Sequence, residues 1–447
     1  MRHFLFLFLI LALSPLLARA AEERAVVAEL FPQFEGIRVG KIEIRGLLRS
    51  REPVVRWILG AREGQPFNAQ AWQEGIERLY KTESIYEIHT QIEKTGAAGQ
   101  EELRIRVSLI DKWTLFPYFD IQGGGGSVSF SAGLYDANLL GTFTYAYVGG
   151  GYLDREYSYE VGLSQKWFLQ TTYSLGFDLS KRNRPVGFQN AAGELQRNFS
   201  WARSRQLLAV GKQNGERTYW EIQLEAFRDT FKSGDSRALS FLYPDMRQFR
   251  ARPMVKLGKM AHSDYLEQGH ELSLAGSYAN PLHPDRDYHS FEAAWKQVFY
   301  LPETRNIAYF LQAGHMTSAP VAYQFRLGGF DSVRGFSMNR VFGLDFARLN
   351  LEYRSTLLVY QIPFWDLGRM VLQGCVFTDG GSAWNAAGVD AASGALTQKS
   401  IRALYSAGAG LRTIFLHFAN ATARIDLAKT LVPQEGYNVA FGIGQFF

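Results

Sequence analysis

Tyr157-Ser158-Tyr159-Glu160-Val161-Gly162-Leu163-Ser164 alternates between apolar side chains at odd positions and small or polar side chains at even positions. A repeat of two residues places each set on one face of a β-strand. Trp220-Glu221-Ile222-Gln223-Leu224-Glu225 and Glu271-Leu272-Ser273-Leu274 show the same pattern. One face suits lipid and the other suits a water-filled interior, which is typical of a strand in an outer-membrane barrel.

Such segments recur from Trp113 to Phe447 and are separated by turns rich in Gly, Asn, Asp and Pro. Their number predicts a membrane β-barrel of about 16 antiparallel strands over residues 113–447. The strand limits stay undefined between Asn190 and Arg217, where the alternation is poor. A soluble sandwich also alternates, but charged side chains on one face of so many successive strands favour the barrel.

Composition agrees with a barrel, since the chain has 22 Tyr, 33 Phe and 43 Gly but only 14 Pro. The single Cys375 excludes an intramolecular disulfide, so stability must come from another source, which a closed ladder of strands supplies. The net charge of +5 is spread along the chain rather than clustered. Nucleic acid is therefore not expected as a partner.

Residues 1–20 have the organisation of a secretory signal peptide. Met1-Arg2-His3 supplies the positive charge, residues 4–17 are apolar, and Ala18-Arg19-Ala20 has the small-residue pattern of a cleavage site. No later stretch of about 18 uninterrupted apolar residues follows, which disfavours a helical membrane protein.

Residues 36–112 carry a different pattern, predicting a small α+β unit. A strand at residues 39–44 precedes a helix at about residues 52–59. Asn68 is a suitable N-cap for a second helix, whose apolar face is Trp72, Ile76, Leu79 and Tyr80. Two further strands are expected at residues 85–93 and 102–109.

This order of elements, with Gly64-Gln65-Pro66-Phe67 before the second helix and Tyr80-Lys81-Thr82-Glu83-Ser84-Ile85-Tyr86 after it, resembles a POTRA domain. POTRA domains are periplasmic modules that bind chains by adding a strand to a sheet edge. Only one is expected, because residues 21–35 are too few for a second.

The run Arg326-Leu327-Gly328-Gly329-Phe330-Asp331-Ser332-Val333-Arg334-Gly335-Phe336 lies in a long connection between two barrel strands. Its glycines permit tight backbone paths, so we expect this segment to fold into the lumen. An arginine in that setting must be paired or hydrated. Strand alternation turns Glu352 and Asp379 inward, and a guanidinium can bridge two carboxylates where a lysine cannot. We therefore predict that Arg334 pairs with both.

Val333-Arg334-Gly335-Phe336, together with Phe377-Thr378-Asp379-Gly380, is similar to the paired motifs of the BamA and TamA family. This family belongs to the outer-membrane protein 85 superfamily, which joins POTRA domains to a bacterial surface antigen barrel. The resemblance covers nearly all of the chain after residue 20. It implies that Arg334 lies at the tip of an inward-folded loop, supported by Gly328 and Gly329, and pairs with Asp379 and also with Glu352.

The resemblance also implies a weak seam where the first barrel strand, near residues 114–121, meets the last, near residues 437–447. Gly442 and Gly444 fit that expectation, because glycine weakens a strand. The terminal Phe447 resembles the aromatic signal by which outer-membrane barrels are recognised for assembly, although Gln445 departs from the expected apolar residue.

The function that the resemblance implies is that of an outer-membrane insertase or translocase, with the POTRA domain in the periplasm. Its expected partners are unfolded outer-membrane or secreted polypeptides and membrane lipids, with accessory lipoproteins or an inner-membrane protein as further candidates. No cofactor, metal or catalytic residue is expected.

Three alternatives stay open. A two-partner secretion pore would usually carry two POTRA domains and a plug helix. An outer-membrane enzyme would need a Ser/His or carboxylate constellation at the barrel rim, and His262, Ser263 and Asp264, being consecutive, cannot converge as a triad by themselves. A passive porin would leave the α+β unit unexplained.

Overall fold

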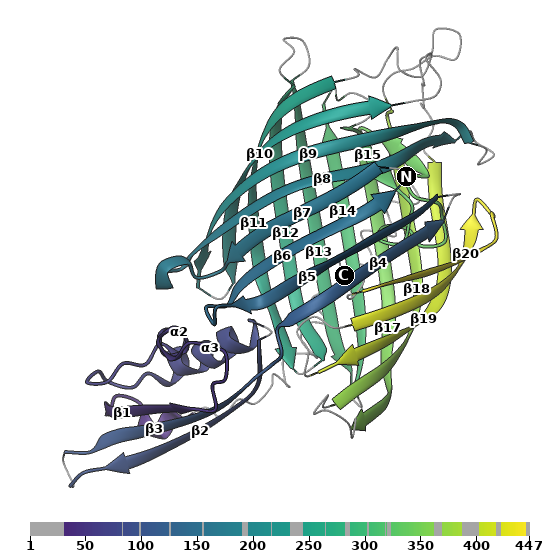
Figure 1. The fold of residues 1–447 in the computed structure, drawn as a ribbon. Helices are drawn as coiled ribbons and strands as arrows, with labels where there is room; N and C mark the ends of the chain where they lie inside the picture. The colour runs from purple at the N-terminus through teal and green to yellow at the C-terminus, as the bar shows by residue number, and fades with distance from the viewer. Residues whose placement is uncertain are drawn as a thin grey trace.

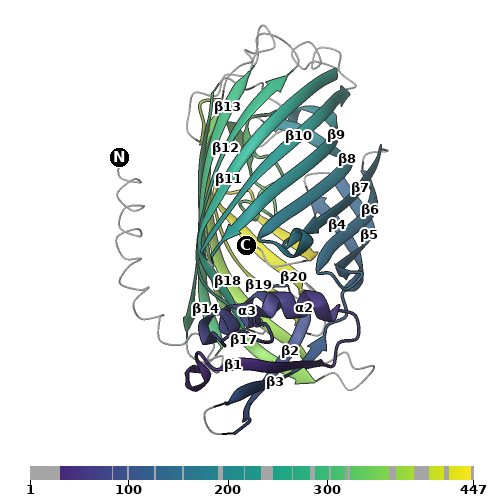
Figure 2. The same cartoon turned by 90° about the vertical axis from the view of Figure 1, so that its left-hand side faces the viewer.

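The computed structural model describes residues 31–443, except for residues 83, 98–99, 125–126, 154–155, 190–194, 216, 233–244, 264, 282–286, 302–303, 318, 320–322, 362–368, 387–401 and 417–421. The chain forms a small N-terminal α+β domain and a 16-stranded sheet that curves into a barrel (Figure 1). Figure 2 shows the small domain at one end of the barrel. The predicted signal peptide at residues 1–20, Gly444 and Phe447 lie outside the described residues.

The N-terminal domain has the predicted order of elements. They are the 3-10 turn η2 (Pro32–Phe34), strand β1 (Arg38–Arg45), helices α2 (Glu52–Leu59) and α3 (Ala69–Tyr80), and strands β2 (Ile85–Thr95) and β3 (Glu102–Asp111). The strand order is β1-β3-β2, with β1 parallel and β2 antiparallel to β3. The Asn68 side chain caps α3 by accepting a hydrogen bond from the Ala71 amide at 2.7 Å, which confirms the predicted helix start.

The two helices cover one face of this sheet. Trp72 and Leu79 of α3 are fully buried against the alternate residues of β3, with Tyr80 partly buried beside them. Glu43 lies on β1, where hydrogen bonds from Arg104 and Lys41 lower the pKa of its carboxyl to about 2. Among the described residues, no helix is both long and apolar enough to span a membrane.

The described barrel strands, each antiparallel to its neighbours, confirm the prediction of about 16 strands. They are β4 (Leu115–Gly124), β5 (Ser127–Leu139), β6 (Thr144–Leu153), β7 (Glu156–Gln165), β8 (Tyr173–Gln189), β9 (Leu195–Asn214), β10 (Thr218–Lys232), β11 (Asp245–Ser263), β12 (Leu266–Pro281), β13 (Tyr288–Leu301), β14 (Arg305–Met316), β17 (Asp345–Gln361), β18 (Arg369–Trp384), β19 (Arg402–Phe415), β20 (Thr422–Val432) and β21 (Tyr437–Ile443). A 3-10 turn, η3 (Phe168–Gln170), lies between β7 and β8.

The region with poor alternation is a long hairpin of β8 and β9, paired from Tyr173 with Lys212 to Gln189 with Leu195. Strand β9 has 20 residues, whereas about 9–11 residues cross a bilayer. The residues of this hairpin that extend beyond the bilayer need no lipid-facing side chains, which explains the poor alternation in this part of the sequence.

The N-terminal domain contacts the barrel at separate points. Asn138, near the end of β5, donates to Ser50 Oγ at 2.8 Å, and Phe143, in the β5-β6 connection, is buried in the domain core. Across the barrel end, Arg369 Nε of β18 donates to the Tyr86 hydroxyl at 3.1 Å. The domain is therefore positioned under the barrel opening rather than hanging from one linker.

Strands β4 and β21 are the two ends of the barrel sheet. Their Cα atoms approach within 8 Å, but no β-ladder joins the described residues of the two strands. We call this junction the seam.

Candidate functional site in the lumen

The connection from β14 to β17 folds against the inner barrel wall. It contains a short hairpin of β15 (Phe325–Leu327) and β16 (Val341–Gly343). Its apolar side chains pack in one buried cluster with wall residues of β17, β18 and β19: Leu327, Val333, Phe336, Val341, Phe346, Ala383 and Leu404. We call residues 323–343 the lumenal loop.

Two glycines shape this loop. Gly328 has φ of 106°, and a Cβ there would lie 2.5 Å from the Ser337 carbonyl oxygen. Gly335 has φ of 93°, and a Cβ there would lie 3.2 Å from the Ala428 side chain on β20. Both positions are left-handed and tightly approached, so only glycine fits without strain. Gly329 also has positive φ, at 103°.

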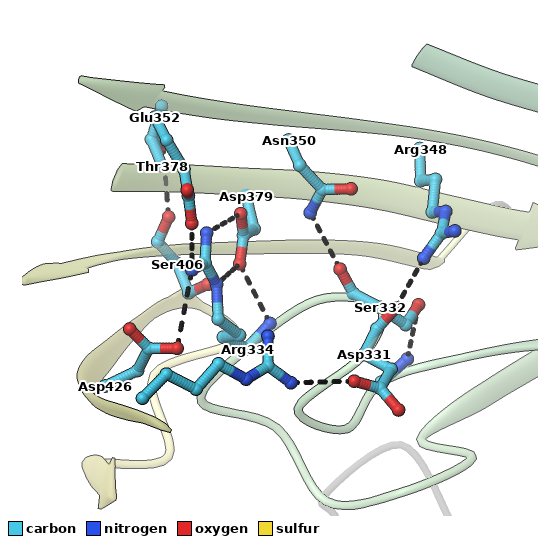
Figure 3. Close-up of polar contacts among 12 residues, drawn as sticks. Asp331, Ser332, Arg334, Arg348, Asn350, Glu352, Thr378, Asp379, Ser406 and Asp426 are labelled. Carbon is cyan, nitrogen blue, oxygen red and sulfur yellow. Dashed lines mark hydrogen bonds and ion pairs between the residues drawn. The ribbon is translucent and has the colours of Figure 1, made fainter. Parts of the chain in front are cut away.

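Arg334 lies at the wall end of the loop and has no exposed surface. Its Nε and one terminal nitrogen donate to the two oxygens of Asp379 at 2.7 and 2.9 Å. The other terminal nitrogen donates to Glu352 Oε1 at 2.5 Å, and the Arg334 amide donates to Asp379 at 3.1 Å. Figure 3 shows this arrangement. The structure thus brings together the arginine and the two acids that the sequence singles out.

The Phe377 ring lies under this guanidinium, with its centroid 3.4 Å from the guanidinium carbon. A cation over an aromatic face is stabilised by the ring quadrupole. Gly380 follows Asp379 on β18. A Cβ at this position would lie 3.6 Å from the Tyr405 side chain, which is an ordinary van der Waals distance.

Three further charged residues, Arg354, Arg412 and Asp426, complete the cluster, and the paired motifs in the sequence contain none of them. Arg412 donates to Asp426 at 2.7 Å and to Glu352 at 3.3 Å, and Arg354 donates to Glu352 at 2.7 Å. Asp426 lies 3.6 Å from Arg334. Strand alternation was the available signal, because Leu411-Arg412 and Ile425-Asp426-Leu427 each place a charge next to lipid-facing residues.

The cluster is electrically balanced: Arg334, Arg354 and Arg412 face Glu352, Asp379 and Asp426. Removing one partner of a buried, hydrogen-bonded ion pair costs about 3–5 kcal/mol, because the other charge is left uncompensated. We call these six residues the arginine brace.

Other contacts hold the loop on either side of the brace. Arg348 donates to the Asp331 carbonyl oxygen at 2.8 Å, and Asn350 donates to the Ser332 carbonyl oxygen at 2.7 Å. Arg424 of β20 donates to the Asp331 carboxylate at 2.8 Å. The loop is therefore bound to β17, β18 and β20 together (Figure 3).

The start of the lumenal loop has a second anchor on a different part of the wall. The Tyr323 hydroxyl donates to Asp229 on β10 at 2.6 Å. Asp229 is fully buried and also accepts hydrogen bonds from Arg203, at 2.8 and 3.0 Å, and from Trp201, at 2.8 Å. The loop therefore extends from the β9-β10 wall to the β17-β20 wall. Nothing in the sequence around Tyr323 identifies this partner.

We expect Tyr323→Phe to release the start of the lumenal loop without unfolding the barrel. The change removes a hydrogen bond to a buried carboxylate, worth about 1.5–3 kcal/mol. Hydrogen exchange over residues 323–343 should become faster. Tyr278→Phe is the matched control, because the Tyr278 hydroxyl donates to the exposed Asp287 at the barrel rim. Equal exchange in both variants would contradict the anchor.

The seam residues are only partly described. Gly442 lies on β21 opposite Arg424, whose Nε is 3.4 Å from the Gly442 Cβ position. Gly444 and Phe447 lie outside the described residues, so their predicted contributions to the seam and to assembly stay predictions.

The fold and the lumenal loop define a class of protein, an outer-membrane barrel attached to a POTRA domain. Residues 138–447 match the Omp85 superfamily domain, and residues 37–109 match a POTRA family described as surface antigen variable number repeat. The chain therefore belongs to the Omp85 superfamily, as the motif resemblance implied. It resides in the outer membrane with its POTRA domain in the periplasm. Proteins of this superfamily are transporters or insertases rather than enzymes, and membership gives the chain a general role in outer-membrane insertion or secretion.

Solved structures with the same fold share little sequence with this chain. CdiB from Escherichia coli aligns with a TM-score of 0.63 at 15% identity, covering 91% of this chain and 76% of that one. BamA from Haemophilus ducreyi lacking POTRA domains 1-3 aligns with a TM-score of 0.55 at 16% identity, covering 91% and 83%. CdiB from Acinetobacter baumannii gives 0.57 at 16%, covering 91% and 73%. No curated protein sequence matches the chain.

Proposed function

We propose that this protein inserts unfolded β-barrel polypeptides into the outer membrane, using its seam as the template for the incoming strand. The observation that carries the proposal is the seam itself. Each barrel strand from β5 to β20 is paired on both sides, whereas no ladder joins the described parts of β4 and β21. An unpaired strand edge is a ready template for another chain.

The POTRA domain supplies a first contact for the client. The outer edge of β1 is occupied, because Val39 donates to the Gln65 carbonyl oxygen at 2.8 Å and Glu63 accepts from the Ile42 amide at 2.9 Å. Strand β2 is the other edge of the sheet. A client strand can therefore add to β2 but not to β1.

The arginine brace gives the barrel wall next to the seam a fixed shape. Glu352, Asp379 and Asp426 belong to β17, β18 and β20, and Arg334 ties all three together. Only β21 lies between this braced wall and the seam. The brace thus confines movement to the seam strands when a client arrives. Lipids next to the seam would receive the folded client, and no cofactor is required.

Release of a polypeptide through the lumen, as in a secretion pore, is the second candidate. The overall similarity to CdiB favours it at the level of fold. Against it stands the lumenal loop, which extends between two parts of the wall and is held at both. Accessory lipoproteins or an inner-membrane protein would act at the POTRA domain.

Reconstitution distinguishes the two candidates. The full-length mature chain in liposomes should accelerate the folding of a urea-denatured outer-membrane barrel, read as the heat-modifiable band on a gel. Heat-denatured protein in the same liposomes is the control. Ion conductance without acceleration for any client tested would contradict insertion and support a pore.

A further inference from the structure

The last residues of β17 expose apolar side chains on both faces of the strand. Leu357, Leu358, Val359 and Tyr360 have exposed fractions of 59, 51, 46 and 48%. Higher on the same strand only alternate residues are exposed, as shown by Leu351 at 39% beside the fully buried Glu352. A barrel strand has one lipid face, and Leu358 and Val359 are consecutive residues of the regular β17–β18 ladder, so lipid alone does not explain the exposure of both.

This segment is also an unpaired edge. The ladder between β14 and β17 ends where Arg305 pairs with Ser355, and Thr304 accepts the last hydrogen bond, from the Thr356 amide. On the other side, β17 stays paired with β18 as far as Gln361 with Arg369, past a bulge at Leu357. We call residues 357–360 the rim edge. Within the part of the chain that the structure describes, no strand lies beside the backbone groups on its β14 side.

The rim edge is continuous with the interface between the barrel and the POTRA domain. Val359 pairs with Val371, and directly paired residues place their side chains on the same face. Val371 is fully buried in a cluster that Tyr86 of β2 packs against, and Arg369 donates to the Tyr86 hydroxyl. Figure 2 shows the ends of β17 and β18 beside the POTRA domain. Strand β2 is the free POTRA edge, so the two free edges lie at one interface.

We propose that the rim edge binds an extended, apolar segment of the client polypeptide by strand addition, between its capture on β2 and its arrival at the seam. This inference rests on the proposed function. Lipid would cover the side chains but leave the backbone N–H and C=O groups unpaired, which is costly in an apolar medium. Water would satisfy the backbone but leave the side chains exposed. An added polypeptide strand satisfies both.

Photocrosslinking tests the contact directly. A photoreactive p-benzoylphenylalanine replaces Leu358, Val359 or, as the control, Tyr157 in the full chain in liposomes, and a denatured outer-membrane barrel is then added. Tyr157 is also an exposed residue with a large side chain, 74% exposed, but lies at the opposite rim. Client adducts from both Leu358 and Val359, with none from Tyr157, support the proposal. Lipid adducts alone at the rim edge overturn it.

A substitution measures the functional effect. Val359→Lys places a charge on the edge, a change that discourages strand addition. We expect client folding to slow about fivefold, since an apolar cross-strand contact contributes on that order to pairing. Tyr157→Lys should leave the rate unchanged, and heat modifiability shows that each variant is folded. An unchanged rate in Val359→Lys contradicts the proposal.

The failure of this inference is distinguishable from failure of the proposed function. If the wild-type chain accelerates folding but the rim edge gives no client adducts, insertion stands and the rim edge does not take part. If the wild-type chain gives adducts without acceleration, client binding at the rim edge stands and insertion does not.

Discussion

Arg334→Lys is expected to abolish most client folding and to lower barrel stability, although it keeps the positive charge. The guanidinium binds Asp379 through two nitrogens and Glu352 through the third. A lysine ammonium is a point charge and cannot reach both carboxylates in this geometry. We expect a loss of about 3 kcal/mol, near the lower end for a broken buried ion pair. The measurements are the temperature at which heat modifiability is lost and the client folding rate.

Arg182→Lys is the matched control for this change. Arg182 also faces the lumen and pairs with Glu160 at 2.5 Å, but its side chain is 49% exposed. Such a pair contributes about 0–1 kcal/mol, so this variant should behave as wild type. Asp379→Asn should reproduce the Arg334→Lys defect, because it removes the charge on the other side of the same contact. Wild-type folding of clients by Arg334→Lys would refute the need for bidentate binding.

The inward direction of the acidic residues in the arginine brace could be predicted from the alternation of apolar and polar side chains. Because side chains alternate with a period of two, each residue of a barrel strand belongs to one of two faces. A clear lipid face on the strand then identifies the other face as lumenal. Glu352 lies between Leu351 and Tyr353, which are both exposed in the structure. Its inward direction was therefore predictable, as was that of Asp379. The helices of the POTRA domain were predictable for a similar reason, namely an apolar face at helical spacing.

Contacts between side chains on distant strands could not be predicted from alternation. Alternation says that Asp229 and Asp426 face the lumen, but it does not say which loop residue reaches them. Tyr323 contacts Asp229 across 94 positions of sequence, and the loop path between them depends on tertiary packing. The rim edge could not be predicted from the sequence for another reason. Leu357 to Tyr360 is a continuous apolar run, and the point where β14 ends beside it depends on the strand register.

Locking the seam is expected to abolish client folding completely while leaving the barrel and the arginine brace intact. Insertion by strand exchange requires β4 and β21 to separate, and a disulfide prevents separation. In a Cys375→Ser background, one cysteine replaces Phe116 of β4 and a second replaces Asn438 or Ala440 of β21, positions that alternate with the exposed Leu115, Tyr437 and Val439. The oxidised pair that forms should fold clients no faster than empty liposomes, and reduction should restore the rate.

A disulfide between Val376 of β18 and Ala409 of β19 is the control for cross-linking as such. These residues are directly paired within a complete ladder, where the proposed mechanism requires no separation. The oxidised control should therefore retain wild-type activity. Full activity of the oxidised seam pair would place client entry elsewhere. The rim edge would then be a candidate entry site, because in the described part of the chain the β14–β17 ladder ends before Leu357.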